Sequence, residues 1–280
     1  MKIIVLICEG KTDTSFLSVL LKSEMEFLDY SNKTILSKIK EPLGSYLLHM
    51  FNDYEYEDFK VFERPPIPII LRKNSANSEI FCLIYSADGK NKINNYKQII
   101  TFFRDIASLS SNPNKFALKS GVTSSISLCL FFDADKKGIR PTVEEVKNNY
   151  SNFLPEIEQI AHNTNIKTNT FKSIGCYILF GNDEVGTLED IIIPLMKDGN
   201  ETIFDSAIKY LNDNNFTREE GKLDVEQKKS AIGVAGQLEL SGLDNGDIIR
   251  KSKYLSGKLK NEKCIEIKNF IKEAINNTKT

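Results

Sequence analysis

Two acidic side chains at the end of an apolar run are the residues of this sequence best placed to do chemistry. Asp133 and Asp135 lie one residue apart and follow directly after the mainly apolar segment 126–132. Two carboxylates a few ångströms apart repel each other, and each raises the pKa of the other unless a positive charge lies between them. A divalent cation is the simplest such charge. The pair therefore predicts a metal site.

The N-terminus supplies a third acid in a similar setting. The apolar run 3–8 is followed by Glu9, Gly10 and Asp13, and then by a helical pattern of apolar residues. An acid and a glycine turn between a strand and a helix are typical of the first half of a βα unit. Open α/β sheets bind ligands beyond the carboxyl ends of their strands. We therefore expect Glu9 to lie at the same sheet edge as the two aspartates.

The elements that must position these acids form an α/β pattern. Short apolar runs bounded by polar turns predict strands buried on both faces, as in a parallel sheet covered by helices. Four such runs, each followed by a helical pattern, occur at 3–8, 80–86, 126–132 and 176–180. The helix after the third run is predicted to begin at Pro141 and to extend to about Asn163, with a kink or a break at Pro155. The sequence thus predicts an α/β domain over residues 1–197.

Two segments depart from this alternation. Residues 23–78 contain a helix-like pattern at 31–50 and then an acidic, aromatic and proline-rich stretch, and we interpret them as an insertion that ends in a short hairpin. The insertion offers a surface for a protein partner, although a solvated acidic face is the commoner reason for such a stretch. Over 198–280 the strand patterns fade and an α-helical C-terminal region is expected. Its helices are predicted at 202–212, 225–239, 246–260 and 264–276.

Composition narrows the class of protein. The 280 residues carry 37 Lys and Arg against 38 Asp and Glu, so any nucleic-acid binding must come from a local basic patch. No apolar run approaches the ~20 residues that span a bilayer, and the N-terminal run is too short for a signal peptide, so we expect a cytoplasmic protein without a membrane segment. Five cysteines without a CxxC pair and only two histidines argue against a His-dependent zinc site or a Ser/His/Asp triad.

The ordered set of motifs resembles the Toprim domain, the metal-binding α/β module of topoisomerases, bacterial primases and the overcoming-lysogenization-defect nucleases. EGKTD at 9–13 matches the first Toprim motif, and DADKKG at 133–138 matches the DxD motif after the third strand. SADGKNKI at 86–93 is similar to the glycine turn after the second strand. GTLEDIIIPL at 186–195, with the helical tail, is most similar to small stand-alone Toprim-like proteins of bacteria and archaea. The resemblance covers residues 1–22 and 79–195. No GxxxxGK[ST] loop occurs, so the ATPase that some such nucleases carry is not expected.

The resemblance implies a Mg²⁺- or Mn²⁺-dependent nuclease or phosphotransfer enzyme that acts on DNA or RNA. Its catalytic residues would be Glu9, Asp133 and Asp135, with Glu9 as general acid or base. The implied metal ligands are Glu9, Asp13, Asp133, Asp135, Glu189 and Asp190, enough for one or two hard cations, which prefer oxygen ligands. The alternative is a module that keeps the fold and binds nucleic acid or nucleotides without turnover.

Several of these acids have structural alternatives. Asp13 could balance the dipole of the helix that it begins. Thr187 with Asp190 three residues later resembles a capping box, so Asp190 serves stability as readily as chemistry.

Basic residues beside the motifs are candidates for phosphate contacts, although exposed lysines are usually only solvated. Those in the loops are Lys11, Lys90, Lys136 and Lys137. In the tail, Arg250, Lys251 and Lys253 belong to a basic stretch that is the best candidate for contact with a nucleic-acid backbone. Lys229, which follows Lys228, is our candidate for the distant active-site lysine of some Toprim nucleases.

Overall fold

The computed structural model describes residues 2–30, 67–75, 78–111, 125–214 and 223–276, together with Gly44. Apart from Gly44, the helix-like pattern predicted at 31–50 and the acidic stretch after it lie outside the described residues. The described parts include every predicted catalytic, metal-binding and phosphate-contacting residue.

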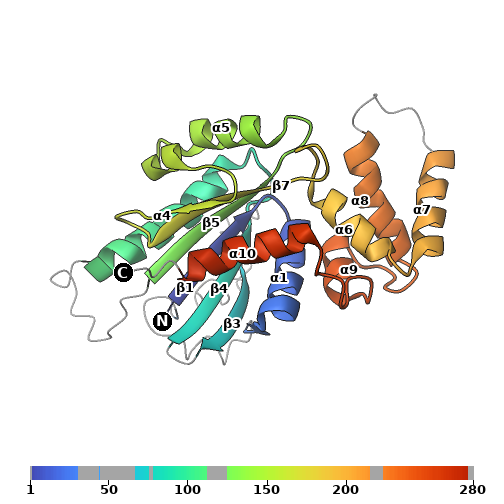
Figure 1. The fold of residues 1–280 in the computed structure, drawn as a ribbon, viewed down its shortest axis with the longest axis horizontal. Coiled ribbons are helices and arrows are strands. Elements are labelled where there is room, and N and C mark those ends of the chain that lie inside the picture. The colour runs from blue at the N-terminus through green and yellow to red at the C-terminus, as the bar shows by residue number, and fades with distance from the viewer. Residues whose placement is uncertain are drawn as a thin grey trace, which may run out of the picture.

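A mixed sheet forms the centre of the fold (Figure 1). Its strands are β1 (Lys2–Cys8), β2 (Leu28–Asp29), β3 (Ile69–Ser75), β4 (Ser78–Ser86), β5 (Ser125–Asp133), β6 (Thr164–Ile166) and β7 (Ser173–Leu179). They follow the order β2-β3-β4-β1-β5-β7-β6. The four inner strands β4, β1, β5 and β7 run parallel, and β2, β3 and β6 pair antiparallel at the edges. Cys8 lies opposite both Ser86 and Phe131, so β4, β1 and β5 reach the same edge together.

The described helices are α1 (Lys11–Met25), α4 (Ile93–Ser111), α5 (Ile139–Tyr150), the 3-10 helix η2 (Pro155–Gln159), α6 (Leu188–Lys197), α7 (Glu201–Asp213), α8 (Leu223–Gly236), α9 (Asn245–Lys251) and α10 (Glu262–Asn276). Helices lie on both faces of the sheet, whereas α7 and α8 lie beside it and pack on α6 and α9 (Figure 1). Successive side chains of β1 point to opposite faces of the sheet and pack into the hydrophobic core on that face. Leu6 and Cys8 pack on the side of α1, α6, α9 and α10, whereas Val5 and Ile7 pack on the side of α4 and α5.

The four predicted strand-helix units are confirmed as β1-α1, β4-α4, β5-α5 and β7-α6. They could be recognised because strands buried on both faces are apolar along their whole length. The hairpin expected at the end of the insertion is also confirmed, since β3 pairs antiparallel with β4.

Two predicted helices are shorter than expected. The helix predicted to extend to about Asn163 ends at Tyr150 and is followed by η2 and by the unpredicted edge strand β6. Pro155 accounts for the break, because Leu154 before it adopts a non-helical φ of −139°. The helix predicted at 246–260 is only α9, which ends at Lys251 and is followed by turns that include Gly257 at φ 71°.

The C-terminal helix α10 closes the face of the sheet that carries α1. Its Ala274 carbonyl accepts a hydrogen bond of 2.8 Å from Ser127 Oγ of β5, and the Phe270 carbonyl accepts one of 3.1 Å from Asn165 of β6. Phe270 also touches Phe131 edge-on, with ring centroids 5.7 Å apart. The end of the chain therefore shares a core with its first strands.

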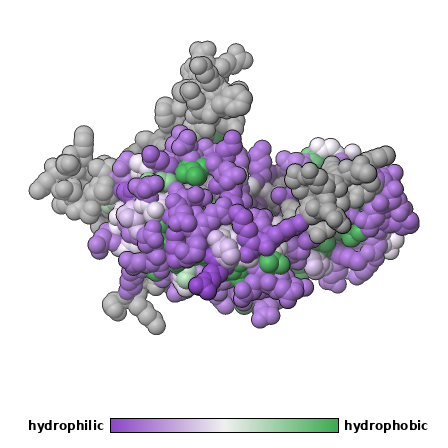
Figure 2. Space-filling model, turned by 90° about the horizontal axis from the view of Figure 1, so that it is seen from above, coloured by the Kyte–Doolittle hydropathy of each residue, from purple (hydrophilic) through white to green (hydrophobic). Residues whose placement is uncertain are grey.

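The surface is mostly polar. On the face shown in Figure 2, apolar side chains form separate spots among hydrophilic ones. The large apolar residues exposed in the described parts are Leu28, Val185, Tyr210, Leu238 and Ile265, and they lie on different elements. None of the described helices is long and apolar enough to cross a bilayer.

Candidate active site at the carboxyl edge of the sheet

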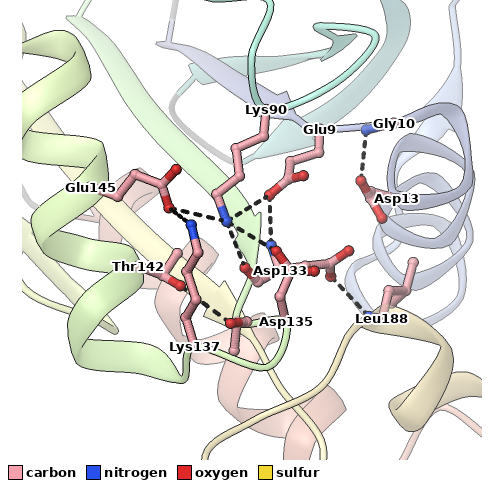
Figure 3. A network of polar contacts seen from close by, with 11 residues as sticks. Glu9, Gly10, Asp13, Lys90, Asp133, Asp135, Lys137, Thr142, Glu145 and Leu188 are labelled. Atoms are coloured by element: carbon pink, nitrogen blue, oxygen red, sulfur yellow. Dashed lines mark hydrogen bonds and ion pairs between the residues drawn. The ribbon is translucent and has the colours of Figure 1, made fainter. Parts of the chain in front are cut away.

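Glu9 and Asp133 meet where β1 and β5 end. Glu9 follows Cys8 directly, and its Oε1 accepts a hydrogen bond of 2.9 Å from the backbone N–H of Asp133 (Figure 3). The predicted meeting of these two residues at one sheet edge is therefore confirmed. Since side chains alternate along a strand, Glu9 lies toward the α4 and α5 face and Asp133 toward the face of α1 and α6. The site consequently has two halves, with Glu9 between them.

The first half, which we call the Asp133 half, consists of Asp13, Asp133, Glu189 and Lys229. Asp133 Oδ1 accepts from the backbone N–H of Leu188 at 2.9 Å. Asp13 is 6% exposed and Glu189 1% exposed. Lys229 Nζ lies 3.9 Å from Glu189 Oε1, and the Lys229 side chain is 49% exposed. Three buried acids thus face one half-exposed lysine.

The helix starts that carry Asp13 and Glu189 also donate hydrogen bonds to these two acids. Asp13 Oδ2 accepts from the N–H of Gly10 at 2.8 Å, at the beginning of α1. Glu189 Oε2 accepts from Thr187 Oγ1 at 2.8 Å, at the beginning of α6. The starts of two helices therefore point at the Asp133 half, and their dipoles favour negative charge there.

The second half, which we call the Lys90 half, consists of Lys90, Asp135, Lys137 and Glu145. Lys90 Nζ lies 3.2 Å from Asp135 Oδ2, 3.7 Å from Glu145 Oε2 and 4.0 Å from Glu9 Oε1. It also donates to the carbonyl of Asp133 at 3.4 Å. The more exposed Lys137 also forms an ion pair with Glu145, at 3.0 Å (Figure 3). Here each carboxylate has an ammonium beside it.

The pKa values of Glu9, Asp13 and Asp133 are raised, and burial is the largest cause for each. Burial raises the pKa of Glu9 to about 7, although Lys90 and the N–H of Asp133 lower it. Burial raises the pKa of Asp13 to about 7 against the donation from Gly10, and the nearby carboxylates of Glu189 and Glu9 add to the rise. Burial and the charges of Asp13, Glu9 and Glu189 raise the pKa of Asp133 well above its ordinary value. The ionised forms of these three acids are therefore less favourable here than in water.

The pKa values of Lys90 and Lys229 are also raised, although burial lowers them, because the nearby carboxylates favour the charged ammonium. Burial lowers the pKa of Lys90, but Glu9 and Asp135 outweigh it, so that the pKa is raised. The same holds for Lys229, whose pKa is raised by Glu189, Asp133, Asp13 and Glu9 in that order against the effect of burial. Lys229 therefore lies within electrostatic reach of all four acids, although it belongs to α8, far away in the sequence.

The carboxylates of Asp135 and Asp133 have different hydrogen-bond partners. Its φ of 53° is left-handed, and it forms an isolated antiparallel bridge with Gly186 through hydrogen bonds of 2.8 and 2.7 Å. This backbone geometry directs the Asp135 carboxylate to Lys90, whereas Asp133 points to Leu188. The DxD pair is thus divided between the two halves.

Asp190 takes part in the N-terminal cap of α6. The capping box is present, with Asp190 Oδ2 accepting from Thr187 N at 2.9 Å, and Oδ1 pairs with Lys228 at 2.7 Å. A Cβ at Gly186 would lie 2.6 Å from Asp190 Oδ2, so this loop needs a glycine there. Both oxygens of Asp190 are engaged, which favours the capping alternative.

The predicted phosphate-contacting residues fall into two groups. Lys11 and Lys136 are exposed, on the first turn of α1 and on the turn after Asp135. Arg250 and Lys251 both pair with Asp247 within α9, and Lys253 is exposed on the turn that follows. The tail stretch is partly neutralised by its own acid, so the lysines around the sheet edge are the stronger candidates.

Sequence reasoning missed Glu145 and assigned Lys90 a different task. Glu145 belongs to α5, and nothing in its sequence surroundings distinguishes it from the neighbouring Glu144. Lys90 was predicted to contact phosphate, but in this structure it binds carboxylates.

The donor set of Asp13, Asp133 and Glu189 fits a hard divalent cation, because it consists of buried carboxylate oxygens. In the parts of the chain that the structure describes, no three His, Cys, Asp or Glu side chains are arranged as a preformed set of metal ligands. Each acid of the Asp133 half uses one oxygen for a backbone or hydroxyl donor. The other carboxylate oxygens are the ones that could bind an ion.

Comparison with known proteins gives a fold and a family. The crystal structure of hypothetical protein PH0156 from Pyrococcus horikoshii OT3 has a TM-score of 0.53 to this chain at 21% sequence identity, over 98% of this chain and 95% of that one. At this identity the likeness shows a common fold only. No curated protein matches the sequence significantly. The family model described as "Protein of unknown function (DUF3226)" matches residues 3–276, and the chain therefore belongs to that family.

Proposed function

We propose that this protein is a Mg²⁺- or Mn²⁺-dependent enzyme of Toprim type that cleaves or transfers phosphodiester bonds of nucleic acid. The observation that carries the proposal is the Asp133 half, where three acids are buried around one half-exposed lysine at the ends of β1 and β5. Such an excess of negative charge is costly unless protons or a cation compensate it.

The residues that would hold the ion are Asp13, Asp133 and Glu189, with Glu9 beside them. A divalent ion there would neutralise phosphate charge and make a bound water more acidic. The Toprim resemblance supports the same residues through the positions of Glu9 and Asp133 after the first and third parallel strands of the sequence.

Glu9 has the properties of a general acid or base. Its pKa of about 7 allows it to hold or release a proton near neutral pH, where proton transfer by a side chain is most effective. The Asp133 N–H and Lys90 orient its Oε1, which leaves Oε2 to face a substrate. Lys229, and the exposed Lys11 and Lys136, would offset phosphate charge.

The test is cleavage of labelled single- and double-stranded DNA and RNA with Mg²⁺ or Mn²⁺. We expect product with the wild type, and a loss of ~100-fold or more with Glu9→Gln and Asp133→Asn. Glu144→Gln is the matched control, since Glu144 is a 59% exposed acid of α5 that pairs only with Lys147 among the described residues. Equal rates for all variants would contradict the proposal.

A non-catalytic binding module is the second candidate. The Lys90 half favours it, because its acids are already neutralised by ammonium groups and one of them is the Asp135 of the DxD motif. Metal-dependent binding of nucleic acid or nucleotides without any product, in the same assay, would identify this alternative.

A further inference from the structure

The ammonium group of Lys90 lies among three carboxylates. Its side chain is only 13% exposed, and Nζ lies within 4.0 Å of carboxylate oxygens from Glu9, Asp135 and Glu145. The Asp133 carbonyl adds a fourth oxygen at 3.4 Å. Several oxygens, three of them from carboxylates, around one buried positive charge are the surroundings that a hard cation also prefers.

The backbone holds this ammonium in place. The turn that carries Lys90 is pinned to the end of β1 by two hydrogen bonds, from Ala87 N to the Cys8 carbonyl at 2.9 Å and from Gly89 N to the Glu9 carbonyl at 2.7 Å. Gly89 has a φ of 121°, which permits the tight turn. The backbone of Lys90 is therefore held at the carboxyl edge of the sheet by hydrogen bonds to the end of β1.

The charges of the two halves differ. With all groups ionised, Asp135 and Glu145 of the Lys90 half stand against Lys90 and Lys137, a formal balance of 0, or −1 if Glu9 between the halves is counted with them. Asp13, Asp133 and Glu189 stand against Lys229 alone, a formal balance of −2. Lys229 is also half exposed, and among the described residues its ammonium forms an ion pair with Glu189 alone, at 3.9 Å.

We infer that Lys90 is a built-in cation that occupies one of two cation positions at this edge, so that the protein binds a single divalent ion, in the Asp133 half. This inference rests on the proposed metal dependence and specifies its stoichiometry. A second ion in the Lys90 half would have to displace an ammonium that four oxygens hold, and it would meet the charge of the first ion across Glu9. Lys90 is thus a positioning residue that holds the Asp135 carboxylate in the Lys90 half and orients Oε1 of Glu9 between the two halves.

The test counts ions on the full-length protein. Titration calorimetry with Mn²⁺ and with Mg²⁺, supported by counting of free Mn²⁺ in electron paramagnetic resonance, gives the number of ions bound per chain. We expect one ion for the wild type and two for Lys90→Met, which keeps the length of the side chain and removes its charge. Lys92→Met is the matched control with one ion expected, because Lys92 is exposed on the same turn and forms no ion pair in the described parts.

The outcomes separate this inference from the proposed function. No ion bound to the wild type would overturn the metal dependence itself. Two ions bound to the wild type, or one ion bound to Lys90→Met, would overturn the role of Lys90 and leave the metal dependence standing.

A second pair of variants covers the case in which Lys90→Met does not fold, as monitored by thermal unfolding. Asp135→Asn should still bind one ion with an affinity within about threefold of wild type, because Asp135 is an acid of the Lys90 half. Asp133→Asn should lose binding by about tenfold or more, because a carboxylate supplies a large share of the affinity for a hard cation. The reverse order would place the ion beside Lys90 and overturn the inference.

Discussion

The two halves of the edge are built from the same residue types but are neutralised in different ways. In the Lys90 half, an almost buried ammonium contacts each carboxylate directly. In the Asp133 half, backbone N–H groups and one hydroxyl donate to the acids, and the lysine stays half exposed. The carboxylates of the Lys90 half are neutralised within that half, whereas the Asp133 half has a deficit of positive charge that the proposed cation would supply.

Helix dipoles do not remove this deficit. The beginnings of α1 and α6 donate to Asp13 and Asp133, and each helix start carries the equivalent of about half a positive charge at most. Partial charges of this size favour carboxylates at a helix end but do not neutralise three buried ones. Burial, together with the neighbouring carboxylates, raises the pKa values of Asp13 and Asp133 even though both accept hydrogen bonds.

The largest expected difference between the halves is catalytic. We expect Asp133→Asn to reduce the rate of phosphodiester cleavage by ~100-fold or more, and Asp135→Asn to reduce it by less than ~10-fold. The reason is that Asp133 faces Asp13 and Glu189, whereas Asp135 is held by Lys90. Initial rates at saturating Mg²⁺ measure both effects. Equal losses would show that the DxD aspartates act together and that the division into halves is wrong.

The architecture that positions Glu9 and Asp133 could be predicted from the sequence because it depends on local patterns. Apolar runs in the sequence identified the strands β1, β4, β5 and β7. Because these strands run parallel, their carboxyl ends lie at the same edge of the sheet. Thr187 and Asp190 were recognisable as a helix start from their spacing alone. Lys229 was named through the resemblance, and the structure places it within reach of the acids.

The division of the DxD pair could not be predicted, since it depends on contacts between distant segments. Asp135 turns away because its backbone pairs with Gly186, and its carboxylate meets Lys90 from another βα loop. Glu145 joins the same cluster from α5. Motif matching assigns residues by their order along the chain. It cannot show toward which neighbouring segment each carboxylate points.

A smaller effect distinguishes the two lysines of α8. We expect Lys229→Met to strengthen Mg²⁺ binding about three- to tenfold, because it removes a positive charge near the proposed ion position. The same change should slow cleavage, since Lys229 would no longer offset the charge of the phosphate. Calorimetry and initial rates on the same preparation would show affinity and activity moving in opposite directions.

Lys228→Met is the matched control for that prediction. Lys228 pairs with Asp190, whose other oxygen caps α6, so this variant should change Mg²⁺ affinity less than about twofold. If Lys228→Met strengthened Mg²⁺ binding as much as Lys229→Met, the effect would reflect the overall charge of α8 and not the Asp133 half.

The smallest expected effect is on stability without metal. The pKa of Asp13 is about 7 in the folded chain and about 4 when unfolded, so between these values the folded state binds more protons. Its contribution to stability is therefore full below pH ~4, falls as pH rises to 7, and stays constant above. Thermal unfolding in a chelator should show Asp13→Asn gaining about 2–5 °C on the wild type between pH 5 and pH 8. Saturating Mg²⁺ should remove this gain, because the ion would compensate the charge that only the wild type carries. The same pH dependence in both proteins would mean that Asp13 is neutralised as completely as the acids around Lys90.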